Sequence, residues 1–142
     1  MITITKITDK SDLEAAYAVR EKVFVEEQQV PREEEYDEFE EIAQHYLARY
    51  NTIPCGAARW RKTNKGIKLE RFAVLADYRN KAIGSRILEQ VLQDVKAAYP
   101  NEVVYLHAQV PAVPFYGRQG FVAEGPMFSE CDIDHYKMIL HA

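Results

Sequence analysis

The fold is decided by one stretch of the chain, residues 68–98, which reads KLERFAVLADYRNKAIGSRILEQVLQDVKAA. Its first part, residues 69–75, is rich in apolar and β-favouring side chains and predicts a strand. The segment ADYRNKAIGS that follows is too polar to extend this strand. Beyond it, apolar side chains recur at the spacing of one helix face: Ile83, Ile87, Leu88, Val91, Leu92 and Val95. The stretch therefore predicts a strand, a short basic turn and a helix.

A turn of this kind can bind an anion. The first turn of a helix leaves backbone N–H groups without partners, and the helix dipole adds partial positive charge there. Small and basic residues suited to a pyrophosphate surround this turn: Gly84, Ala82, Ser85, Arg79, Lys81 and Arg86. The alternative is an ordinary connection between strand and helix with solvated basic residues. A Rossmann fingerprint needs three glycines and a P-loop needs Gly-Lys-Ser/Thr, and the turn has neither.

Composition limits the class of protein. The 142 residues are enough for a single domain, residues 1–142, and too few for two. A net charge of −4 argues against a general nucleic-acid binder, which is normally basic. No apolar run approaches the roughly 20 residues of a membrane span, and the N-terminus lacks a signal-peptide pattern. Cys55 and Cys131 are too few for a disulfide framework, so we expect free thiols and a cytoplasmic protein.

The remaining elements follow from local patterns. Residues 2–8 alternate as a first strand, and Ser11 with Glu14 forms a capping box for a helix that ends near Gln28. Its buried side is expected to hold Leu13, Ala16, Tyr17, Val23 and Phe24. Further strands are expected at residues 44–50 and 55–61 as a hairpin, then at 103–108, 121–128 and 134–140, with a short helix within 111–120. The strand at 103–108 should pair in parallel with the strand at 69–75, since a helix joins them.

An acidic run, EEQQVPREEEYDEFEE, occupies residues 26–41 and holds nine of the 22 acidic residues against one arginine. One interpretation is a solvated loop or helix face. The other is an acidic wall that steers a cationic amine toward a nearby site. Tyr36 and Phe39 interrupt the run and indicate that it packs against the rest of the protein.

Two motifs carry a family resemblance. Residues 79–84, RNKAIG, resemble the Q/R-x-x-G-x-G/A signature of the GNAT acyltransferase superfamily, whose loop binds the pyrophosphate of acetyl-CoA. Ala82 stands where the family usually has glycine, and alanine suits this position only if its φ is negative. Residues 109–121, QVPAVPFYGRQGF, resemble N-x-x-A-x-x-F-Y-x-x-x-G-F, with Gln109 in place of asparagine. Residues 20–31, the acidic run and His45 are similar to a bacterial GNAT subgroup whose substrates are mostly unassigned.

The resemblance implies a fold and an activity. The fold would be α/β (α+β), with a mixed, mostly antiparallel sheet, a splayed parallel pair in its middle and helices on both faces. The activity would be direct transfer of an acetyl group from acetyl-CoA to a primary amine. Tyr116 stands where these enzymes place the general acid, and its alternative role is a core aromatic. The residues matched to the cosubstrate are Phe72, Ala73, Val74, Arg79, Asn80, Lys81, Ala82, Ile83, Gly84, Ser85, Gln109, Ala112 and Phe115.

The general base is open at this level. Glu70 lies two residues before Phe72, so strand alternation places both side chains on one face, and burial would raise the pKa of the carboxyl group. Alternatively Glu70 pairs with Arg59 or Arg61 on the neighbouring strand. Other candidates are Glu35, Asp37, Glu38 and His45. The spacing of His107, His135, His141 and the two cysteines is not that of metal ligands, so we expect no metal.

Several alternatives remain for the whole chain. One is a module of the same fold that binds CoA or regulates without turnover, which Tyr116 argues against. Another is an acyl donor other than acetyl-CoA. The acceptor amine is not specified by the sequence, and a homodimer is compatible with it.

Overall fold

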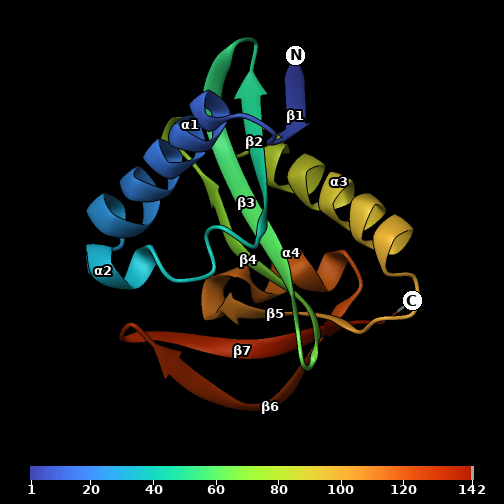
Figure 1. Ribbon diagram of the computed structural model, residues 1–142. Helices are drawn as coiled ribbons and strands as arrows, with labels where there is room; N and C mark the ends of the chain where they lie inside the picture. Colours follow the sequence, from blue (N-terminus) through green and yellow to red (C-terminus); the bar gives the residue numbers. More distant parts are fainter. Residues whose placement is uncertain (142) are drawn as a thin grey trace.

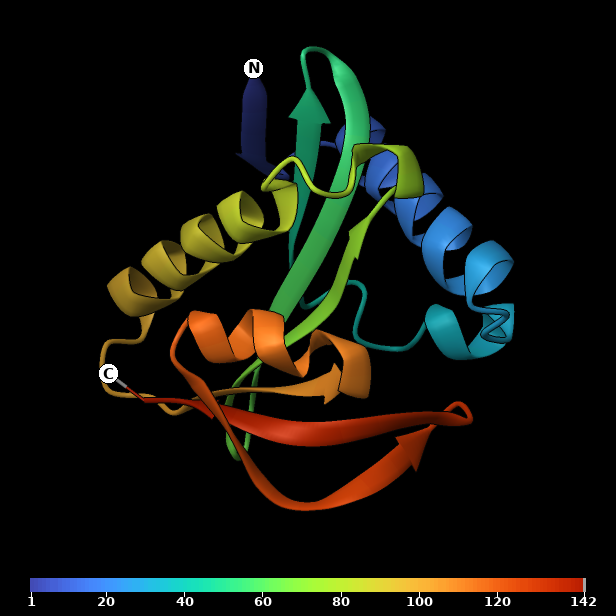
Figure 2. The same ribbon diagram turned by 180° about the vertical axis from the view of Figure 1, so that it is seen from behind.

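The computed structural model describes residues 1–141, which form one seven-stranded sheet with helices on both faces (Figures 1 and 2). The elements, in chain order, are β1 (Ile2–Lys6), α1 (Lys10–Arg20) with a π-helical continuation (Glu21–Glu27), α2 (Arg32–Glu35), β2 (Gln44–Tyr50), β3 (Ile53–Thr63), β4 (Gly66–Val74), α3 (Ile83–Ala98), β5 (Val104–Gln109), α4 (Val113–Arg118), β6 (Phe121–Glu130) and β7 (Ile133–Leu140). Within this part of the chain no helix is long and apolar enough to cross a membrane.

The strand order is β1-β2-β3-β4-β5-β7-β6, and only β4 and β5 pair in parallel. The predicted fold class is therefore confirmed, including the helix α3 that crosses between the two parallel strands. The predicted stripe of α3 packs on the sheet, with Ile83, Ile87, Leu88, Val91 and Val95 buried and Leu92 partly buried. On the opposite face, α1 buries Ala16 and Val19 against Leu47, Ala57 and Ala73.

Helix α1 begins earlier than predicted. Its N-cap is Asp9, whose side chain accepts a hydrogen bond from the backbone N–H of Asp12 at 2.8 Å. Ser11 lies inside the helix and is exposed, so the predicted capping box is wrong. Asp and Ser are equally good N-cap residues. The helix starts just after Asp9 because Asp9 lies three residues before Asp12, whose N–H its side chain binds.

A β-bulge interrupts β4 at Arg71. Ala57 pairs with Ala73 and Arg59 pairs with Glu70, so three residue steps on β4 match two on β3. Arg71 has φ 58°, in the left-handed region. The extra residue breaks the alternation of side chains. Glu70 therefore lies on the α1 face beside Arg59, whereas Phe72 packs in the core on the α3 face, and the prediction that they share a face is wrong.

The parallel pair opens just before the bulge. Its register pairs are Ile67–Val104, Lys68–Tyr105 and Leu69–Leu106, and the ladder ends there. Strand β4 continues to Val74 and β5 continues to Gln109, so a gap separates their last residues. This splay was expected from the family resemblance, and it determines where the candidate site lies.

Candidate active site

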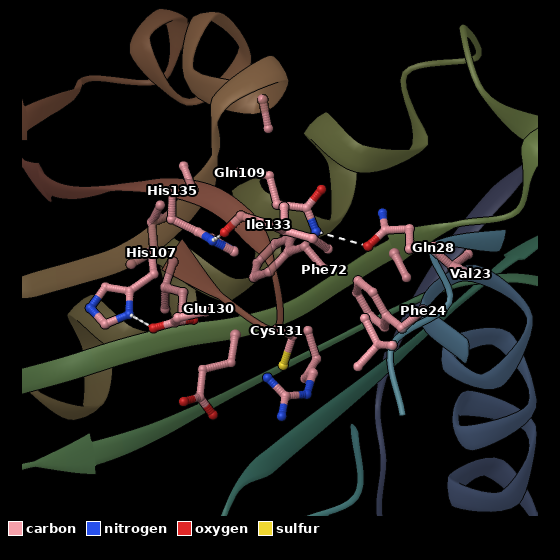
Figure 3. Close-up of a pocket in the computed structure, with 18 of the residues that line it drawn as sticks. Val23, Phe24, Gln28, Phe72, His107, Gln109, Glu130, Cys131, Ile133 and His135 are labelled. Carbon is pink, nitrogen blue, oxygen red and sulfur yellow. Dashed lines mark hydrogen bonds and ion pairs between the residues drawn. The ribbon is translucent and has the colours of Figure 1, made fainter. Parts of the chain in front are cut away.

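Two cavities approach the gap from opposite faces of the sheet. The first, called the α3-side cleft, has a volume of about 440 Å³ and lies between the end of β4, the start of α3 and α4. The second, called the α1-side pocket, has a volume of about 520 Å³ and reaches from the end of α1 and from α2 to β5, β6 and β7 (Figure 3). Both are lined by Phe72, Ala73, Val74, Arg79, Ala112 and Tyr116. The gap between β4 and β5 is thus accessible from both faces.

The start of α3 forms one end of the α3-side cleft. Ala82, immediately before the helix, has φ 63° and ψ 19°, so the condition of a negative φ under which alanine suits this position is not met. The chain adopts here the conformation that glycine adopts most easily, and alanine does so at a cost. No side chain in the described chain caps this helix end. The N–H groups of the first turn of α3 can therefore bind an anion in the cleft.

Most residues matched to the cosubstrate line this cleft. They are Phe72, Ala73, Val74, Arg79, Asn80, Ala82, Ile83, Gly84, Ser85, Ala112 and Phe115. Lys81 does not line it, because its ammonium group lies over the ring of Tyr50 at 5.3 Å. Gln109 lies in the α1-side pocket instead, where its amide donates to Gln28 Oε1 at 2.9 Å (Figure 3).

Arg79 fixes the end of β4. Its Nε donates to the carbonyl oxygen of Val74 at 2.9 Å, and its two terminal nitrogens each contact the carboxylate of Glu27 at 2.8 Å. The guanidinium thus ties the continuation of α1 to the last residue of β4. Its charge is already partly balanced before any ligand binds.

Tyr116 lies where the two cavities meet. Its ring contacts those of Phe72, Phe115 and Phe121 edge to face, at centroid distances of 6.2, 5.0 and 5.9 Å. The residue is 9% exposed, and burial raises the pKa of its phenol above the ordinary value. The hydroxyl is therefore protonated throughout the physiological range and can donate a proton or hydrogen bond at the junction.

Glu70 is held in an ion-pair cluster. Its carboxylate contacts Arg59 Nε at 2.7 Å, Arg61 at 3.1 Å and Lys68 at 3.2 Å. Burial alone would raise its pKa, but the hydrogen bonds of Arg61 and the charges of Arg59 and Lys68 outweigh it, and the pKa is lowered. The expected rise in the pKa of Glu70 is therefore wrong, and the predicted alternative, pairing with both arginines, is confirmed.

The acidic run is only partly a solvated face or an open acidic wall, because four of its carboxylates bind arginines: Glu27, which binds Arg79, and three others. Glu35 pairs with Arg20 and Arg71, Asp37 with Arg59 and Arg71, and Glu40 with Arg20 and Arg59. Hydrogen bonds and charge from Arg59 outweigh the effect of burial and lower the pKa of Asp37 to about 2. Glu33, Glu34 and Glu38 are exposed. The two buried arginines, Arg20 and Arg59, are what the sequence interpretation missed.

The other base candidates are also engaged or remote. Glu35 and Asp37 are in the ion-pair cluster, and Glu38 is exposed. The Nε2 of His45 is 2.7 Å from the carbonyl oxygen of Glu40, and burial lowers the pKa of its imidazole. Within residues 1–141, no group of three or more His, Cys, Asp and Glu side chains is arranged to hold a metal ion.

The α1-side pocket also contains residues that the sequence interpretation did not assign. His107 Nδ1 lies 2.7 Å from Glu130 Oε1 (Figure 3). The ring of Phe128 contacts those of His107 and His135, at centroid distances of 5.0 and 5.8 Å. Cys131 lies at the turn between β6 and β7 and also lines the pocket. The sequence predicts the closing pair of strands, and β7 of this pair holds His135 next to β5. It does not show which residues of the two strands pair, so the position of His135 could not be predicted.

Comparisons with known proteins identify the family and agree with the fold. A family model described as an acetyltransferase (GNAT) domain matches residues 7–142. The N-acetyltransferase YjcF, an uncharacterized protein of Bacillus subtilis, is 38% identical over 132 residues, which cover 92% of this chain and 94% of that protein. The crystal structure of Escherichia coli ElaA has a TM-score of 0.86 at 25% identity, covering 99% of this chain and 100% of that one. An acyl-CoA N-acyltransferase from Pseudomonas aeruginosa has a TM-score of 0.82 at 25% identity, covering 99% of both chains.

Proposed function

The chain belongs to the GNAT acetyltransferase family and is an acyl-CoA-dependent N-acetyltransferase, and we propose that its donor is acetyl-CoA and its acceptor a primary amine. One observation carries this proposal: two cavities on opposite faces of the sheet meet at the gap between β4 and β5. A donor in one cavity and an acceptor in the other can react there directly, without a covalent intermediate on the protein.

The donor occupies the α3-side cleft. Its pyrophosphate is held by the N–H groups at the start of α3, which the left-handed Ala82 directs into the cleft. The pantetheine arm follows the free edge of β4 along Phe72, Ala73 and Val74, which lie beyond the last register pair with β5. The rings of Phe72 and Tyr116 line the junction and favour a short acyl group such as acetyl.

The reaction proceeds at the junction. The amine nitrogen attacks the thioester carbonyl carbon, and a backbone N–H of β4 stabilises the oxygen that becomes negative. The C–S bond then breaks, and the thiolate takes the proton of the Tyr116 hydroxyl. The nitrogen of the new amide carries one extra proton, which passes to the phenolate oxygen of Tyr116 and restores the phenol. Glu70 is not assigned as the base, because three cationic side chains hold its carboxylate and lower its pKa.

The test is Tyr116→Phe, which keeps the packed ring and removes the hydroxyl. General acid catalysis contributes roughly 10²–10⁴-fold, so kcat for thiol release should fall within that range. The affinity for CoA, measured by calorimetry, should be unchanged, since the hydroxyl acts only in the chemical step. Tyr99→Phe is the matched control, because Tyr99 packs on Trp60 and lines neither cavity.

Unchanged kcat in Tyr116→Phe would remove Tyr116 from the mechanism. Tight binding of CoA with no turnover of any amine by the parent protein would refute the proposed reaction.

A further inference from the structure

His135 lies on β7, which is separated from the gap by β5, and on the side of the α1-side pocket. It pairs with Gln109 in the antiparallel ladder of β5 and β7. Gln109 lies three residues beyond Leu106, where the ladder with β4 ends, and its side chain reaches Gln28 on the α1 face. Directly paired residues of an antiparallel ladder point to the same face. His135 therefore faces the pocket one strand away from the gap, and Figure 3 shows it beside Gln109.

The hydrogen bond of the ring identifies its basic nitrogen. Nδ1 lies 2.7 Å from the carbonyl oxygen of Ile133, and a carbonyl oxygen can only accept, so Nδ1 carries a hydrogen. Nε2 is therefore the nitrogen that gains and loses a proton. The ring is stacked on Phe128 at 5.8 Å with an interplanar angle of 21°, and the residue is 7% exposed. Both contacts hold the imidazole ring in place.

We propose that His135 is the general base of the transfer and that its Nε2 takes a proton from the ammonium group of the acceptor. This proposal rests on the proposed function. An alkyl amine, with a pKa near ~10, is mostly charged at neutral pH and must lose a proton before its nitrogen lone pair can attack. That proton passes to His135 and then to solvent, while Tyr116 protonates the leaving thiolate. The proton is thus removed on one side of the gap and supplied at the other.

His107 is the competing imidazole, and its position is less suitable. It lies one residue beyond the last register pair of β4 and β5, at the start of the gap, whereas Gln109, the partner of His135 on β5, lies three residues beyond that pair. Its Nδ1 is bound to the carboxylate of Glu130. The ionisable groups that line the pocket with His135 come from α2, β4, the segment between β4 and α3, β5, α4, β6 and the turn after β6: Glu34, Glu35, Lys68, Glu70, Arg71, Arg79, His107, Tyr116, Glu130 and Cys131.

The experiment compares His135→Asn with the parent protein over a range of pH. The amide N–H of asparagine can replace Nδ1–H toward Ile133, but no basic nitrogen remains. We expect kcat/KM for the amine to fall roughly 10²-fold or more near pH 7, and the acidic limb of the pH profile to disappear. The loss should shrink as the pH approaches the pKa of the amine, because solvent then supplies neutral amine. CoA affinity should be unchanged. His107→Asn is the control and should keep the acidic limb, whatever its effect on KM.

A second measurement is made on the parent protein. The imidazole of His135 is titrated by NMR in the parent enzyme, which has four histidines, and its signal is assigned by its absence from His135→Asn. Its midpoint should coincide with that of the acidic limb of kcat/KM. Different midpoints, or an unaltered acidic limb in a folded His135→Asn protein, would overturn the proposal while leaving acetyl transfer intact. A parent protein that turns over no amine would overturn both.

Discussion

Replacing Ala82 with glycine is expected to stabilise the protein. An L-residue in the left-handed region costs roughly 1–2 kcal/mol, because its Cβ approaches the following carbonyl oxygen. Glycine avoids this cost but loses roughly 0.5–1 kcal/mol more conformational free energy on folding. Ala82 is exposed, so little packing is lost. The difference is a gain of about 0.5–1 kcal/mol, which in a chain of 142 residues corresponds to a rise in Tm of roughly 2–4 °C.

The assay is thermal and denaturant unfolding of the ligand-free protein, with Ala97→Gly as the matched control. Ala97 is an exposed residue of the same helix, α3, but lies near its C-terminal end, where the chain is helical. There the same substitution should lower the free energy of unfolding by roughly 0.5–1 kcal/mol. The two variants should thus change stability in opposite directions. A decrease in Tm for both would show that the backbone at Ala82 is not strained.

Two further changes test the cleft and the ion-pair cluster. Gly84→Glu should abolish the rise in Tm that CoA causes, because it adds a negative charge where the pyrophosphate binds, whereas Gly84→Ala should keep it, since a Cβ there meets Phe115 at an ordinary 3.5 Å. If CoA still stabilises the Glu variant, the pyrophosphate binds elsewhere. Because folding lowers the pKa of Asp37, its carboxylate stabilises the protein fully above the pKa of the unfolded state, about 4. This contribution is lost as the pH falls through the pKa of the folded state, about 2. Asp37→Asn should therefore be less stable than the parent at neutral pH, and the difference should vanish in acid. The control Glu38→Gln, at an exposed position, should have the stability of the parent at each pH. An Asp37→Asn protein with parental stability at every pH would contradict the reasoning.

The order of strands and helices could be predicted because it depends on local patterns. The apolar residues of α3 recur with the period of a helix, and each strand is bounded by turn residues. The motif residues of the α3-side cleft could be predicted for the same reason, because one turn and the start of one helix place them in the cleft.

The details that failed depend on tertiary contacts. A period of two predicts the face of Glu70 only if no bulge intervenes, and the bulge at Arg71 is accompanied by contacts of its side chain with Glu35 and Asp37 on another element. The burial of Arg20 and Arg59 is equally invisible in sequence, because charged residues are rarely buried unless paired, and all their partners except Glu70 lie in an acidic run that resembles a surface segment.

The gap between β4 and β5 has a mechanical consequence. The sheet consists of a four-stranded leaf, β1 to β4, and a three-stranded leaf, β5 to β7, and their ladder comprises three register pairs at one end. An acyl-CoA whose pantetheine arm lies along the open edge of β4 would act as an additional strand there and bridge the two leaves. Local opening of the unliganded sheet should therefore be concentrated beyond Leu69 and Leu106. The cosubstrate would then be a structural component of the sheet as well as a reactant, and its departure as CoA would leave the two leaves joined at one end.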